Sequence, residues 1–292
     1  MKRLLIACWI IVVGAICCEG LEANTNVNLR VYCADNILIL RTMPACSVDL
    51  IYIDPPFNTG RRRERKRFQL EEGSKLSSET LGYDDKFQDY RLFLEPRMRE
   101  AYRVLKPTGS LFLHLDYREV HYVKVMLDEI FGRASFINEI IWVYDFGGRS
   151  KTRWSPKHDN ILWYAKDPKN YTYNYEVIDR IPYMAPGLVG KEKARQGKTP
   201  TDVWWNTIVS PTGNEKTGYP TQKPRAIIDR IVKVHSNPGD VCLDFFAGSG
   251  TLGESAVCLG RRAILIDINK DAIEVMKKRF EKFNVEWKTE GE

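Results

Sequence analysis

Four residues that could do chemistry follow a short apolar run, residues 48–53 (VDLIYI). They are Asp54, Pro55, Pro56 and Phe57. The two prolines fix their φ angles and lack N–H donors, so they make a rigid turn. In that turn the Asp54 carboxylate and the Pro55 carbonyl can both accept hydrogen bonds from one substrate group, which suits a group with two hydrogens. Phe57 would then stack on the ring that carries this group.

The exocyclic amine of adenine or cytosine fits this description. Its lone pair is delocalised into the ring, and two acceptors that hold its hydrogens favour a pyramidal nitrogen able to attack. Neither the amine nor the ring face is reachable within a duplex, so the base would have to be flipped out. An Asp-Pro-Pro turn after a strand is also common in ordinary loops, and the tetrapeptide alone leaves that interpretation open.

A second motif, residues 243–251 (LDFFAGSGT), reads as a strand, a glycine-rich turn and the start of a helix. Small residues let the backbone approach a ligand, and the helix amino end favours a carboxylate. An acid at the end of the next strand, nineteen residues after Gly248, suits the ribose hydroxyls of a nucleoside cofactor. The candidate cofactor residues of this region are Asp244, Phe246, Gly248, Gly250, Thr251 and Asp267.

The cofactor that this pattern favours is S-adenosylmethionine, with Asp244 holding the methionyl ammonium. The run lacks the full GxGxxG of NAD sites, although another dinucleotide-binding fold remains the alternative. Methyl transfer from a sulfonium is an in-line displacement that depends on positioning, so no metal is expected.

Both motifs sit in an alternation of apolar and amphipathic segments. Strands are predicted at residues 48–53, 110–115, 241–245 and 263–266, and helices at 90–105, 119–131, 224–235 and 271–283. This alternation predicts an α/β fold with a doubly wound, mostly parallel, Rossmann-like sheet. Two polar segments, residues 61–82 and 145–217, interrupt it and are predicted to be insertions at strand ends.

With these motifs in one order, the chain resembles the amino-group DNA methyltransferases in which the catalytic motif precedes the cofactor motif. The resemblance covers residues 28–283 and includes SVDLIYIDPPFNTG, RVLKPTGSLFLHLD, NEIIWVY, KHDNILWYAKDP, GYPTQKP and LDFFAGSGT with LIDIN. One departure is Phe245, where relatives commonly carry proline.

The resemblance implies further roles. Asp35 would lie near the cofactor adenine, and Thr221, Gln222 and Lys223 would lie against its methionyl part. Asp at position 54 goes mostly with adenine N6 in this family, so adenine is favoured and cytosine N4 is the alternative. Double-stranded DNA is the expected partner, and a homodimer and a cognate restriction endonuclease are possible further partners.

The two insertions carry the positive charge. Residues 61–67 hold six basic residues and one acid, and residues 145–198 hold eleven basic residues and six acids. A charge run is usually a solvated loop, yet next to the catalytic turn it could follow DNA phosphates. The candidate DNA-binding residues are Arg61, Arg62, Arg63, Arg65, Lys66, Arg67, Arg149, Lys151 and Arg153.

The predicted organisation has five parts. They are an apolar leader at 1–20, a catalytic half at 26–144, a target-recognition insertion at 145–217, a cofactor-binding half at 218–284 and a tail at 285–292. The leader has the layout of a secretory signal. Nevertheless, the body has no CxxC spacing, and Cys33 and Cys242 read as reduced thiols in apolar strands, so a cytoplasmic protein with an extraneous leader is expected.

Composition excludes several classes and leaves two rivals. A hydrophobic content of 43% and a net charge of +6 are ordinary for a folded enzyme, which argues against disorder, a coiled coil and a multi-span membrane protein. A secreted or membrane-tethered nucleic-acid-binding protein without activity, and a methyltransferase for RNA or small molecules, remain alternatives. His114 and His158 are expected to be structural, because the displacement needs no imidazole.

Overall fold

The computed structural model describes residues 27–71, 75–210 and 212–289, with only the backbone described at 65–71 and 75–81. The predicted leader, residues 1–20, therefore lies outside the described residues. In the described ranges, no helix is both long and apolar enough to cross a bilayer.

One mixed sheet of nine strands organises the described chain, in the order β11-β1-β10-β9-β2-β5-β7-β6-β8. Eight of these nine strands run in the same direction, and β7 runs antiparallel to its neighbours β5 and β6. The strands are β1 (Leu29–Cys33), β2 (Val48–Ile53), β5 (Leu105–Leu115), β6 (Phe136–Val143), β7 (His158–Ala165), β8 (Val203–Trp205), β9 (Val241–Asp244), β10 (Arg262–Asp267) and β11 (Val285–Thr289).

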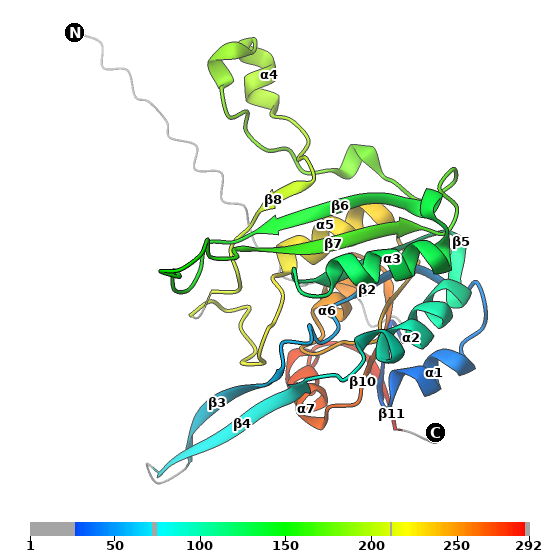
Figure 1. Ribbon diagram of the computed structural model, residues 1–292, viewed down its shortest axis with the longest axis vertical. Helices are drawn as coiled ribbons and strands as arrows, with labels where there is room; N and C mark the ends of the chain where they lie inside the picture. Colours follow the sequence, from blue (N-terminus) through cyan, green and yellow to red (C-terminus); the bar gives the residue numbers. More distant parts are fainter. Residues whose placement is uncertain (1–26, 72–74, 211, 290–292) are drawn as a thin grey trace.

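Helices cover both faces of the sheet (Figure 1). One core packs α1 (Asn36–Thr42), α2 (Tyr90–Val104) and α3 (Val120–Phe131) on one face. The other core packs α5 (Arg225–His235), α6 (Thr251–Cys258) and α7 (Lys270–Arg279) on the opposite face. In α5 the buried positions 227, 228, 231 and 232 form the apolar stripe that makes this helix lie on the sheet. The doubly wound, mostly parallel architecture predicted from the sequence is confirmed.

The order of the strands reverses between β9 and β2. These strands are parallel neighbours, so their carboxyl ends meet at one edge of the sheet, and β2 is buried along its whole length. In doubly wound folds this reversal opens the crevice in which ligands bind. It places the ends of the two chemical motifs side by side.

The insertion predicted at 61–82 is an antiparallel hairpin of β3 (Arg61–Glu71) and β4 (Lys75–Asp85). The basic run at 61–67 therefore forms a strand rather than the irregular loop that a charge run usually forms. The hairpin projects from the molecule on the same side as the loop between β6 and β7 (Figure 1).

Two predicted boundaries need correction. The insertion predicted at 145–217 is not continuous, because β7 lies inside the main sheet between β5 and β6 with nearly every residue buried. What extends beyond the sheet is a loop at 144–157 and a longer segment at 166–202. The tail predicted at 285–292 contains β11, which pairs in parallel with β1.

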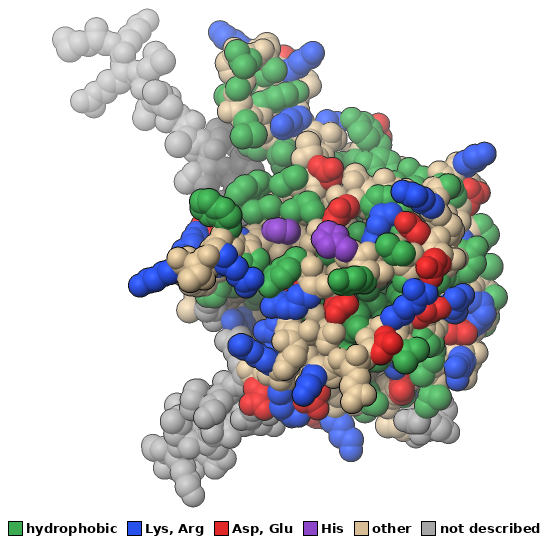
Figure 2. Space-filling model, viewed as in Figure 1, with side chains coloured by type: hydrophobic (Ala, Val, Ile, Leu, Met, Phe, Trp, Pro, Cys, Tyr) green, Lys and Arg blue, Asp and Glu red, His purple; other side chains and the backbone are tan. Residues whose placement is uncertain are grey.

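The longer segment forms an arm with short helical turns. These are η2 (Tyr175–Val177), η3 (Pro186–Leu188) and α4 (Lys191–Gln196), and a further turn, η1 (Arg133–Ser135), precedes β6. The arm presents exposed Met184 and Leu188 together with Lys and Arg side chains (Figure 2).

The aromatic packing between the sheet and α5 generates a stability prediction. Phe112 in β5 is fully buried, with its ring stacked on Trp163 at a centroid distance of 5.5 Å. Phe112→Ala should lower the free energy of unfolding by about 3–5 kcal/mol, through lost transfer energy and the cavity left behind. Urea unfolding measures the loss. Leu92→Ala, at an exposed position of α2, is the control and should change stability by less than about 0.5 kcal/mol; equal losses in both variants would contradict the packing argument.

Candidate active site

Asp54 lies directly after β2 at the edge of the sheet where β9 also ends. Its Oδ2 is paired with the ammonium of Lys223. Its Oδ1 is buried and has no hydrogen-bond partner within the described residues. A buried acceptor without a partner costs free energy, so this oxygen is suited to a donor that arrives with a substrate.

The turn after Asp54 is held rigidly. Pro55 is buried, and the hydroxyl of Tyr90 donates to the Pro56 carbonyl at 2.6 Å. Asn58 ends the turn in the left-handed region, with φ of 53°, and its side chain donates to Glu119 at 2.7 Å. These contacts fix the direction in which Phe57 leaves the backbone.

Phe57 stacks on His114, with ring centroids 5.9 Å apart. His114 is fully buried, and its two ring nitrogens lie 2.9 Å from the Tyr52 hydroxyl and 3.2 Å from the Asp159 carboxylate. Since a carboxylate only accepts, Nε2 donates to Asp159. Burial raises the pKa of Asp159, but its bonds to His114 and Tyr144 and the charge of Lys223 together hold that pKa below its ordinary value. His114 is thus the satisfied structural histidine that the sequence predicts.

A cavity of about 430 Å³ opens at this edge of the sheet. It brings together Asp54 and Pro56 with nearly every residue that sequence reasoning assigned to a cofactor. Those residues are Asp35, Thr221, Gln222, Lys223, Asp244, Phe246, Gly248, Thr251 and Asp267. Gly250 lies behind the cavity, with Phe280 and Met276 against the place where a Cβ would be.

Two acids that line this cavity end neighbouring strands, Asp244 buried and Asp267 half-buried. Asp267 accepts the N–H groups of Gly248 at 2.7 Å and Asn269 at 2.8 Å, and burial raises its pKa to about 6. Asp244 accepts the Phe246 N–H at 2.9 Å. Burial raises the pKa of Asp244 strongly, although the Phe246 N–H opposes this rise, and the charges of Asp54 and Asp267 raise that pKa further. Both carboxyls are suited to bind polar groups of a ligand: hydroxyls at Asp267 and a cation at Asp244.

Asp35 marks another wall of the same cavity. It caps α1, accepting the Ile37 N–H at 3.2 Å, and it pairs with Arg97 at 3.0 Å. Arg97 also lines the cavity, a contact that the sequence did not reveal because Arg97 lies 62 residues away on α2.

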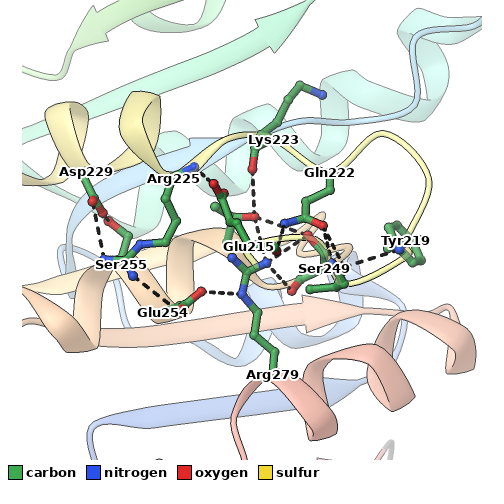
Figure 3. A network of polar contacts seen from close by, with 12 residues as sticks. Glu215, Tyr219, Gln222, Lys223, Arg225, Asp229, Ser249, Glu254, Ser255 and Arg279 are labelled. Atoms are coloured by element: carbon green, nitrogen blue, oxygen red, sulfur yellow. Dashed lines mark hydrogen bonds and ion pairs between the residues drawn. The ribbon is translucent and has the colours of Figure 1, made fainter. Parts of the chain in front are cut away.

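A polar network supports the glycine-rich turn from behind (Figure 3). Arg279 donates to Glu254 at 2.6 Å and to the Ser249 carbonyl at 3.1 Å, and its side chain is only 4% exposed. Arg225 pairs with Glu254, and its backbone N–H donates to Glu215 at 2.7 Å. Sequence reasoning missed these supporting residues, because charged residues on surface-like helices carry no signal of burial.

The same network holds the loop that carries Thr221, Gln222 and Lys223. Gln222 donates to the Glu215 carbonyl at 2.7 Å and accepts from Thr217 at 2.8 Å. Its amide is therefore used within the protein, although the residue still lines the cavity. The Thr251 hydroxyl donates to the Lys223 carbonyl at 3.3 Å, which joins this loop to the glycine-rich turn.

A second cavity of about 400 Å³ adjoins the first. Phe57, Trp142, Tyr144 and Asp159 form part of its wall, and His158 also lines it. Tyr219 and residues 221–223 line both cavities. The two spaces therefore meet at these residues, one of which, Lys223, pairs with Asp54, as a site for transfer between two ligands requires.

The candidate DNA-binding residues lie on two segments, the β3–β4 hairpin and the loop at 144–157, and one of them lines the second cavity. Arg61 and Arg62 are exposed on β3, and Arg63 lines the second cavity while paired with Asp85 at 3.4 Å. In the other group Arg149 pairs with Asp145, and Lys151 and Arg153 are exposed. The side chains of Arg65, Lys66 and Arg67 lie outside the described residues.

Comparison with known proteins identifies the family to which the chain belongs. The model of the N6_N4_Mtase family, described as DNA methylase, matches residues 48–278. The chain belongs to this family of DNA methyltransferases, as the motifs predict.

Individual relatives agree with the family. The chain is 34% identical over 252 residues to the type II methyltransferase M.HpaI of Haemophilus parainfluenzae, covering 86% of this chain and 74% of that protein. It is 32% identical over 275 residues to the DNA adenine methyltransferase YhdJ of Escherichia coli, covering 90% and 84%. Among solved structures, the M1.HpyAVI–SAM complex has a similar fold, with a TM-score of 0.58, 23% identity and coverage of 86% and 98%.

The glycine-rich turn generates a prediction. Gly250 has φ of +74°, and a Cβ there would lie 2.6 Å from Phe280. Gly250→Ala should destabilise the protein by about 3 kcal/mol, combining left-handed strain with overpacking. Thermal unfolding measures this. Gly148→Ala, where a Cβ meets nothing within 4 Å, is the matched control and should be neutral; a neutral Gly250→Ala would contradict the reason given for this glycine.

The raised pKa of Asp267 leads to a prediction about how stability depends on pH. The folded protein keeps a proton on Asp267 up to about pH 6, whereas an ordinary aspartate loses it near 3.8. The unfolded chain thus releases this proton first, so the contribution of Asp267 to stability falls as pH rises between these values. Asp267→Asn should make the free energy of unfolding fall less steeply from pH 4 to pH 6, as urea titrations at several pH values would measure. Parallel pH curves for the two proteins would contradict the assignment.

Proposed function

We propose that this protein transfers the methyl group of S-adenosylmethionine to the N6 amine of an adenine flipped out of DNA, within a specific sequence. The observation that carries the proposal is the position of Asp54. Asp54 lines the first cavity with an Oδ1 that has no partner among the described residues, and its Oδ2 is bonded to Lys223, which lines both cavities and lies 5.1 Å from the centroid of the Phe57 ring.

The first cavity fits the cofactor by the chemistry of its walls. Asp244 would face the methionyl ammonium, Asp267 the ribose hydroxyls, and Asp35 the adenine end. Gly248 and Tyr219 both line this cavity, and a Cβ at Gly248 would lie 3.2 Å from the Tyr219 ring. The absence of a side chain at Gly248 therefore leaves room for the ligand. When bound, the cofactor supplies an electrophilic methyl group on a sulfonium.

The second cavity would hold the flipped base. Phe57 offers a ring face, and Asp54 accepts a hydrogen of the amine, which frees the nitrogen lone pair to point toward the first cavity. Trp142 and Tyr144 wall the base from water. Catalysis in such a displacement comes from alignment, so residues that fix the Asp54 turn contribute through geometry.

Adenine is proposed over cytosine N4. The support is the Asp54 motif together with the relative named as a DNA adenine methyltransferase at 32% identity. Cytosine N4 stays the second candidate, because its amine presents the same two hydrogens and the cytosine-N4-specific PvuII DNA methyltransferase has a related fold, with a TM-score of 0.61.

DNA would lie across the projecting segments. Arg61, Arg62 and Arg63 on the hairpin and Arg149, Lys151 and Arg153 on the loop before β7 would contact phosphates on either side of the flipped base. The arm at 166–202 is the candidate for base recognition. The proposal also includes a homodimer, a cognate restriction endonuclease as partner, and action in the cytoplasm. The exposed Trp205 on the edge strand β8 supports a contact between two copies of the chain.

Asp54→Asn tests the chemistry. The amide keeps the shape but replaces one acceptor oxygen with a donor, so methyl transfer should fall at least about 100-fold while cofactor binding persists. The assay incubates the enzyme with labelled S-adenosylmethionine and plasmid DNA and identifies the methylated nucleoside after digestion. Glu274→Gln, which removes an exposed carboxylate paired with Lys277 on α7 and outside both cavities, is the control.

Two outcomes would contradict the proposal. N4-methylcytosine as the only product would overturn the adenine assignment. Loss of cofactor binding together with activity in Asp54→Asn would mean that Asp54 supports the structure rather than the transfer.

A further inference from the structure

Lys223 occupies a chemically informative place. Its ammonium is bonded to Asp54 and lies 5.1 Å from the centroid of the Phe57 ring, and its side chain is only 8% exposed. Figure 3 shows that its carbonyl faces the polar network while the side chain extends the opposite way. The backbone of Lys223 therefore belongs to the support of the glycine-rich turn, whereas its ammonium belongs to the catalytic turn.

The ammonium has the same two partners that the target amine needs. An amine donating to Asp54 and carried by a ring on Phe57 would use the same carboxylate and the same aromatic face. Lys223 also lines both cavities, so it stands at the point where they meet. A nitrogen that carries hydrogens and sits at this point is a substitute for the nitrogen of the substrate.

The loop geometry directs Lys223 to this place. Thr221 has φ of 59°, a left-handed conformation that is strained for a β-branched residue, and its carbonyl accepts from the Lys223 ammonium at 3.4 Å. The Thr251 hydroxyl holds the Lys223 carbonyl. With the backbone fixed in this way, only the flexible four-carbon stem has to move for the ammonium to leave Asp54.

The ammonium has another acid to move toward. Its charge lowers the pKa of Asp159 in the wall of the second cavity, and it also acts on Asp244. When the ammonium leaves Asp54, its positive charge is therefore still balanced in part by the carboxylates of Asp159 and Asp244.

From these contacts we propose that Lys223 is a positioning residue that occupies the amine site between reactions, holding Asp54 in its accepting geometry until the base displaces it. This inference rests on the proposed function. It means that the ring of the base takes the face of Phe57 from the ammonium at the cost of one shielded ion pair, while the amine of the base donates to the partnerless Oδ1 of Asp54.

The test measures nucleoside affinity in the second cavity. The first cavity is saturated with S-adenosylhomocysteine, and deoxyadenosine is titrated by calorimetry. Lys223→Met keeps the length and removes the charge, so deoxyadenosine should bind roughly tenfold more tightly, the equivalent of about 1.4 kcal/mol. Thymidine, which offers a carbonyl to the bare carboxylate, should show no gain. Lys223→Arg restores the cation and should return the affinity toward that of the unmodified protein.

Two further variants keep the test decisive. Lys106→Met removes a lysine paired with Asp49 at 2.8 Å, outside both cavities, and should leave nucleoside affinity unchanged. Lys223→Ala repeats the test if Lys223→Met fails to fold, as judged by binding of S-adenosylhomocysteine. A merely structural lysine would lower affinity on removal, so an unchanged or weakened affinity for deoxyadenosine overturns the inference.

The proposed function is tested separately by methylation of DNA with the unmodified enzyme. Adenine methylation without a gain of affinity in Lys223→Met overturns the role of Lys223 and leaves the function standing. Absence of methylation overturns the function itself.

Discussion

The constraint on which the site depends is the crowding of carboxylates at one edge of the sheet. Asp54, Asp244 and Asp267 follow or end three neighbouring strands, and each is wholly or partly withdrawn from water. Buried like charges are costly unless hydrogen bonds or cations compensate them. The surrounding structure can be understood as that compensation: backbone N–H groups at Asp244 and Asp267, and the Lys223 ammonium at Asp54. The N–H groups offset burial only in part, since the pKa of Asp244 and of Asp267 stays raised. Asp54 Oδ1 has no hydrogen-bond partner among the described residues, and a substrate would bring the missing donor to this atom.

This compensation links the two halves of the chain. The loop with Thr221 and Lys223 lies about 170 residues after Asp54, and it reaches the catalytic turn only because α5, α6 and the glycine-rich turn share one polar network. Arg279 on α7 closes that network through Glu254 and Ser249. Side chains that touch no ligand therefore set the distance between the two cavities. An enzyme that relies on the alignment of its ligands rather than on an acid or base needs side chains that hold the binding residues in place.

The sequence predicted the regular part of this arrangement because periodicity and strand-end motifs are local signals. The strand at 48–53 and the helices at 90–105 and 119–131 were predicted within a residue of their observed bounds, and Asp54, directly after that strand, lines the first cavity. The Lys223–Asp54 pair and the burial of Arg279 were not predictable, since they depend on which helix faces which turn. The boundary at 145 failed for a physical reason: β7 is antiparallel and begins with His, Asp and Asn, so its first residues read as a loop although Asp159 and Asn160 are buried against the site.

The position of β7 also changes how recognition and chemistry are related. Asp159 in β7 contacts both His114, which backs Phe57, and Tyr144, which leads into the loop before β7. The loop and the longer arm are therefore extensions of the β6–β7 pair of the main sheet rather than a separate module attached to the enzyme. Asp159 is the buried carboxylate that joins the start of this loop, through Tyr144, to the histidine behind Phe57. Under the proposed function, this linkage favours phosphate contacts over base contacts for the loop: phosphate binding is uniform along DNA, so the position of Phe57 would not vary with the sequence being read.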